Sequence, residues 1–95
     1  MDYNNESIRT IAEMEALAEK KVNGNAERWL DVACVLDYIT LKEKEAVVAL
    51  LRKQQSSTQK NENFVFGKSS YAVLNRMKEI IKNTTFPLAL LRTVR

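Results

Sequence analysis

The sequence of 95 residues contains no histidine, one cysteine, one proline and two glycines. The chain therefore lacks the ligands of an ordinary zinc site, a histidine for acid–base catalysis and a second cysteine for an internal disulfide. The shortage of proline and glycine excludes collagen-like repeats and folds made of many tight hairpins. No apolar run approaches the length of about 20 residues that a membrane-spanning helix needs. We therefore expect neither a metal, nor another cofactor, nor a membrane partner.

The remaining composition is that of an ordinary globular domain, with 45% hydrophobic and 28% charged residues. A chain of this length has room for one core of useful size, so residues 1–95 are expected to form a single domain. The polar, acidic start Met-Asp-Tyr-Asn-Asn-Glu does not resemble a secretory signal, and a cytoplasmic location is expected.

The net charge of +3 hides a division between the two halves of the chain. Residues 1–50 hold ten acidic and six basic side chains, whereas residues 51–95 hold nine basic side chains and only two acidic ones. A basic segment of this kind is typical of chains that bind a polyanion, with nucleic acid or an acidic protein face as the candidates.

Apolar residues recur at three- and four-residue spacing over 6–22 and predict a first amphipathic helix. Asn5 or Ser7 is expected to cap its start, and Gly24 to end it in the left-handed conformation. A second, strongly apolar helix is predicted over 26–39, with Asn25 as its cap. Thr40 and Glu43 have the spacing of a capping box, which predicts a third helix over 41–54.

Residues 54–63 contain no apolar side chain and predict a solvated linker. The segment Phe64-Val65-Phe66-Gly67 is expected to form a short strand or an apolar plug. Ser69 or Ser70 would then cap a fourth helix over 70–82, and a short helix over 87–93 follows Pro87. The predicted class is all-α with four or five helices: an acidic three-helix unit (1–53), a polar linker (54–63) and a basic helical segment (64–95).

The second helix carries Trp29, which is predicted mainly as a core anchor and, alternatively, as part of an interface. Apolar residues surround most of this helix, and a small monomer has little capacity to cover them, so a homodimer is plausible. The candidate oligomer or partner interface comprises Trp29, Leu30, Val32, Leu36, Phe64 and Phe66. Cys34 is expected to be a small core side chain.

The fourth helix is the main functional candidate because its polar residues, including Asn75, Arg76, Lys78, Glu79 and Lys82, are predicted to face solvent. Its N-terminal turn offers backbone N–H groups to a phosphate, and Asn and Arg side chains can contact base edges. The helix therefore resembles a helix-turn-helix recognition helix. The alternative is a solvated helix that packs on the core. The candidate DNA-binding residues are Lys68, Ser69, Ser70, Asn75, Arg76, Lys78, Lys82 and Arg92.

An enzyme is not expected. Ser57 and Lys60 match the Ser-x-x-Lys spacing of some serine acylases, but they lie in the predicted linker without the companion motifs. The carboxylates of the first half have the spacing of solvated helix faces and predict no metal site.

Residues 18–54 resemble the PerC-like family of small enterobacterial regulators. The resemblance rests on the Arg28-Trp29-Leu30-Asp-Val32 stretch, the Thr40 and Glu43 helix start, and the basic end Arg52-Lys53. It implies a transcriptional regulator that acts on promoters of virulence or mobile-element genes.

Two hypotheses follow from these observations. The first is a small bacterial or phage-borne transcriptional regulator that binds double-stranded DNA through its basic fourth helix and dimerises through the Trp29 helix. The second is a non-enzymatic module that binds a host protein, with apolar contacts from the second helix and the Phe64–Phe66 segment, and with the basic half against an acidic partner.

Overall fold

A computed structural model describes residues 2–60 and 65–86, which form a compact all-α domain and include no strand. The predicted fold class is confirmed. The four helices are α1 (Tyr3–Val22), α2 (Ala26–Val35), α3 (Leu41–Lys60) and α4 (Lys68–Asn83). The predicted helix over 87–93 lies outside the described residues.

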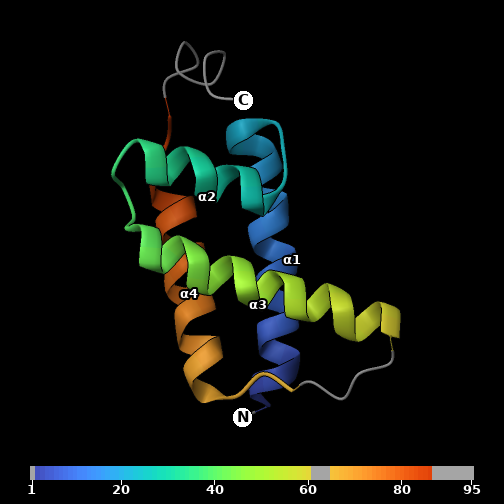
Figure 1. Cartoon of the computed structure of the whole chain (residues 1–95). Coiled ribbons are helices and arrows are strands. Elements are labelled where there is room, and N and C mark those ends of the chain that lie inside the picture. Colours follow the sequence, from blue (N-terminus) through green and yellow to red (C-terminus); the bar gives the residue numbers. More distant parts are fainter. Residues whose placement is uncertain (1, 61–64, 87–95) are drawn as a thin grey trace.

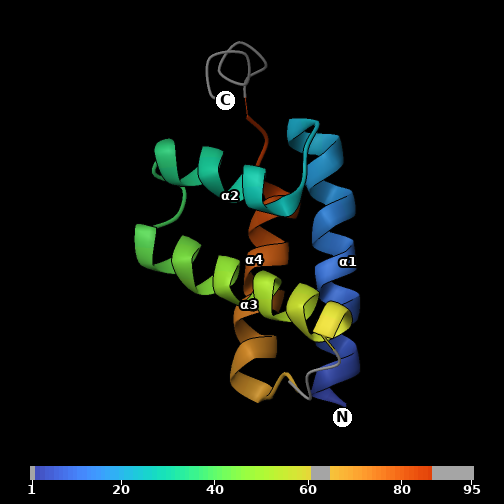
Figure 2. The ribbon, with the colours of Figure 1, turned by 45° about the vertical axis from the view of Figure 1, so that its right-hand side comes forward.

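The helices form two crossed pairs (Figures 1 and 2). Helices α1 and α4 lie side by side and run in the same direction, and they make the most extensive helix–helix contact in the described chain. Helices α2 and α3 run in opposite directions and cross one face of that pair, one above the other. Because α1 and α4 are parallel, their C-terminal turns lie at the same end of the domain.

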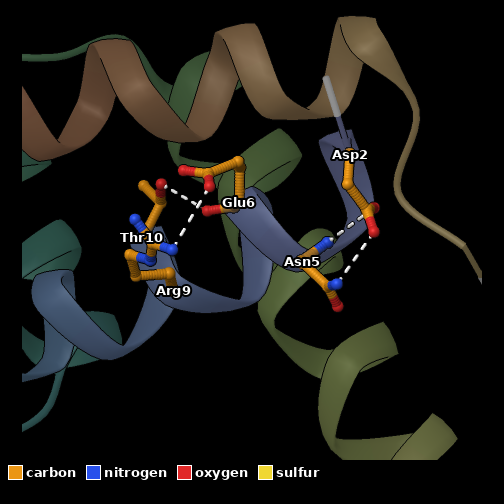
Figure 3. A network of polar contacts seen from close by, with 5 residues as sticks. All are labelled: Asp2, Asn5, Glu6, Arg9 and Thr10. Atoms are coloured by element: carbon orange, nitrogen blue, oxygen red, sulfur yellow. Dashed lines mark hydrogen bonds and ion pairs between the residues drawn. The ribbon is translucent and has the colours of Figure 1, made fainter.

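The ends of α1 differ from the prediction. The helix begins at Tyr3, where the Oδ1 atom of Asp2 accepts the backbone N–H of Asn5 at 3.1 Å (Figure 3). The carboxylate of Asp2 thus serves as the cap that was expected from Asn5 or Ser7, and Ser7 is buried inside the helix. At the other end, Asn23 rather than Gly24 takes the left-handed conformation, with φ 54°. Asparagine is one of the few side chains that adopt this conformation readily.

Helix α2 has the predicted cap but ends four residues before the predicted position. The Oδ1 atom of Asn25 accepts the backbone N–H of Arg28 at 2.9 Å. The helix stops at Val35 because Asp37 adopts a left-handed φ of 64°, and the N–H of Tyr38 returns to the carbonyl of Ala33 at 2.8 Å. This is the Schellman arrangement, in which the last carbonyls are satisfied as the chain turns away.

Helix α3 confirms the predicted capping box and corrects its predicted end. The Thr40 N–H donates to Glu43 Oε1 at 3.0 Å, and the Glu43 N–H donates to Thr40 Oγ1 at 3.1 Å. The helix then continues to Lys60, so residues 54–60 are helical and not linker. This stretch is rich in glutamine and contains neither proline nor glycine, and glutamine favours a helix even without apolar contacts. Residues 61–63 of the predicted linker lie outside the described part.

Helix α4 begins at Lys68 and not at residue 70. Gly67 precedes it, without a side-chain cap from Ser69 or Ser70. The predicted break after residue 82 is confirmed, because the helix ends at Asn83 and Thr84 has an extended backbone.

All four helices contribute to one hydrophobic core, in which Trp29 is completely buried. The first predicted unit and the described part of the C-terminal segment are therefore packed together. Phe66 enters the same core from the connection before α4, as the plug interpretation predicted, and its N–H donates to Asn4 Oδ1 at 2.9 Å. The α4 side of the core consists of Leu74, Met77 and Ile81, with Phe86 just beyond the helix.

Candidate functional site

The predicted interface residues lie mostly inside the chain. Trp29, Leu30, Val32 and Phe66 are buried, Leu36 is half-buried, and Phe64 lies outside the described residues. Packing within the chain thus covers Trp29, Leu30 and Val32, whereas Val35 of the same helix is 65% exposed. The half-buried Cys34 packs against the same core, as expected.

The predicted DNA-binding residues are distributed over different faces of α4. Lys68, Ser69 and Lys82 are exposed, whereas Ser70 and Asn75 are half-buried. Arg92 lies outside the described part of the chain. The two half-buried residues correct the expectation that this whole set faces solvent.

Lys78 is the clearest correction within that set. Its Nζ atom pairs with Glu13 Oε2 of α1 at 3.1 Å, and its side chain is only 21% exposed. Position 78 turns towards α1 because α4 packs along that helix. The charge of Lys78 is therefore largely compensated within the chain.

Arg76 lies on the opposite, exposed side of α4 and points to α3. Its guanidinium Nη2 atom lies 3.2 Å from Glu43 Oε2, and the side chain remains 72% exposed. This ion pair joins the middle of α4 to the first turn of α3. It also marks one edge of a groove between these two helices.

The groove has a volume of about 400 Å³ and is predominantly apolar. Val47 and Met77 are buried and form its base, while Ala46, Ala72 and Val73 line its open sides. Val73 is 38% exposed although it is a large aliphatic residue.

The groove has a charged rim made of Lys42, Glu43 and Arg76. The backbone N–H of Thr40 lowers the pKa of the Glu43 carboxyl, against the opposing effect of burial; the Thr40 side chain and Arg76 lower it further. Glu43 is thus held in its ionised form by its cap interaction and by Arg76. Lys42 projects from α3 and is exposed.

Sequence reasoning did not identify this groove. The three- and four-residue spacing in the fourth helix predicts one buried side made of Val73, Leu74, Met77, Ile80 and Ile81. That apolar arc spans about 120° of the helix, which is the ordinary width of a core-facing stripe, so the sequence of α4 alone gives no signal of an exposed apolar edge.

Within residues 2–60 and 65–86, no group of three histidine, cysteine, aspartate or glutamate side chains gathers as a metal site would require. None of the described helices is both long and apolar enough to cross a membrane.

Comparison with known proteins returned no matching family model, no matching curated protein and no matching solved structure.

Proposed function

We propose that the protein is a non-enzymatic interaction module that binds an apolar segment of another protein in the groove between α3 and α4. The observation that carries this proposal is the open apolar surface of Ala46, Ala72 and Val73 above the buried Val47 and Met77. Grooves between two helices are a common docking place for the apolar face of a partner helix.

The packing of the domain supports this choice of surface. Trp29, Leu30 and Val32 of α2 are used in the core, whereas Ala46, Ala72 and Val73 of the groove remain exposed. The groove walls are set by two helices that the Arg76–Glu43 ion pair and the shared core hold in place. A preformed site of this kind loses little conformational entropy when a partner binds.

Selection of displayed random peptides against the full chain tests the proposal. Peptides that bind should lose at least about tenfold in affinity on Val73→Asp, because a carboxylate would be buried under the bound apolar side chains. Val65→Asp is the matched control, since Val65 is 65% exposed and lies outside the groove. Selected peptides that bind the Val73→Asp variant as tightly as the parent protein would contradict the proposal.

DNA binding is a second candidate, and one observation favours it. Lys68 and Lys82 remain exposed at the two ends of α4, with the exposed Arg76 between them. The Cα atoms of Lys68 and Lys82 are about 21 Å apart along the helix, a spread that suits contacts to separate backbone phosphates better than reading of base edges. The resemblance of residues 18–54 to PerC-like regulators agrees with this candidate.

A gel-shift titration against random duplex DNA at low salt tests the second candidate. The parent protein should shift the duplex at micromolar concentration. The double variant Lys68→Ala, Lys82→Ala should bind every DNA sequence more weakly by the same factor, and the slope of log affinity against log salt concentration should fall by about two units. Absence of a shift would remove DNA binding and would leave the groove proposal untouched.

A further inference from the structure

The charges at the edge of the groove specify the kind of segment that it would receive, and this inference rests on the proposed function. Lys42 stands on the α3 side of the groove and Arg76 on the α4 side. No acidic side chain of the described residues forms an ion pair with Lys42. Its ammonium group is therefore available to a partner.

The one acidic residue of the rim is already engaged. Glu43 uses Oε1 to accept the Thr40 N–H at 3.0 Å and Oε2 to pair with Arg76 at 3.2 Å. Its negative charge is thus directed into the chain and not towards an incoming segment. Arg76 contacts Glu43 through one terminal nitrogen, and a guanidinium has further donors for a second carboxylate. The rim consequently presents net positive charge.

We propose that the bound segment is an acidic amphipathic helix. Its apolar side chains fill the groove between Ala46, Ala72 and Val73, and its Asp or Glu side chains pair with Lys42 and Arg76. The apolar base provides the affinity, whereas the two cations select the sign of the flanking charge.

A phosphate backbone does not match this site equally well. The walls between the two cations consist of alanine and valine side chains, which offer no hydrogen-bond donor to a phosphate oxygen. A segment that is apolar in the middle and acidic at its edge satisfies both parts of the surface.

Two synthetic helical peptides provide the test. They share one leucine stripe at three- and four-residue spacing and differ only in the flanking residues, which are glutamate in one peptide and lysine in the other. At low salt, the acidic peptide should bind about tenfold more tightly than the basic peptide. The acidic peptide forms two ion pairs with Lys42 and Arg76, whereas the basic peptide meets two repulsions there. Lys42→Glu should reduce that ratio severalfold, whereas Lys20→Glu, an exposed lysine on α1, should leave it unchanged.

The outcomes separate the two proposals. Equal affinity for both peptides, lost in both cases on Val73→Asp, would overturn the acidic-partner inference and leave the proposed function standing. Failure of both peptides to bind would overturn both. Binding of the acidic peptide that is insensitive to Val73→Asp would also overturn both, because it would reflect charge alone.

Discussion

The ring of Phe86 stacks on the indole of Trp29, with ring centroids 5.5 Å apart and an interplanar angle of 28°. Phe86 follows the end of α4, and Trp29 lies in α2, so this contact joins the last described residue to the centre of the core. The ring of Tyr38 also lies against Phe86, with ring centroids 5.3 Å apart. The three rings hold the end of α4 against α2 and the turn that follows it.

We expect Phe86→Ala to destabilise the domain by about 3 kcal/mol, because a buried aromatic ring is replaced by a cavity beside Trp29. Tyr38→Ala should cost clearly less, because Tyr38 is half exposed. Urea unfolding of both variants measures the difference. Equal stability of Phe86→Ala and the parent protein would contradict the stacked arrangement.

The capping box at the start of α3 gives a second prediction. Thr40→Ala should lower the free energy of unfolding by about 1 kcal/mol, since the Glu43 N–H loses its acceptor. Thr40→Ser retains the hydroxyl and should remain close to the parent protein. A neutral Thr40→Ala variant in chemical denaturation would show that the cap contributes nothing to stability.

The lowered pKa of Glu43 makes part of the stability dependent on pH. Because the folded-state pKa lies below the ordinary glutamate value, this contribution is complete above that value and is lost as the pH falls through the lowered pKa. Glu43→Gln should remove it. Unfolding titrations should show a difference between the parent protein and Glu43→Gln that is constant near neutral pH and shrinks in acid. A difference that is independent of pH would refute this.

The ion pair between Lys78 and Glu13 predicts an energetic coupling between α4 and α1. A double-mutant cycle with Lys78→Ala and Glu13→Ala should give a coupling energy of roughly 0.5–1 kcal/mol, because the lysine is partly buried. Lys82→Ala, on an exposed lysine of the same helix, should be nearly neutral. Additive effects of the two substitutions would show that the pair is not formed in solution.

Local signals predicted the parts of the fold that depend on neighbouring residues. Asn25 caps α2, and Thr40 pairs with Glu43, because each interaction spans three residues and needs no information from elsewhere. The early end of α2 has no glycine to signal it, because the left-handed residue there is Asp37. The end of α3 differs from the prediction because a polar, glutamine-rich stretch can be helical without apolar contacts.

The candidate site depends on residues that are far apart in the sequence. Lys78 is largely buried because α4 packs along α1, and the groove exists because α3 crosses α4. Two of the residues on which the resemblance to PerC-like regulators rests have structural roles, since Trp29 is in the core and Glu43 completes a cap, whereas Arg52 of the same set is exposed.

The parallel arrangement of α1 and α4 has a consequence for synthesis on the ribosome. Among the described helices, the most extensive contact joins α1 to α4, so the core stays incomplete until α4 has left the exit tunnel. Until then, the side of α1 and α2 that receives Leu74, Met77, Ile81 and Phe86 is open to water or to chaperones. Contacts of such long sequence separation also slow folding. The first three helices are thus synthesised before the helix that completes their core.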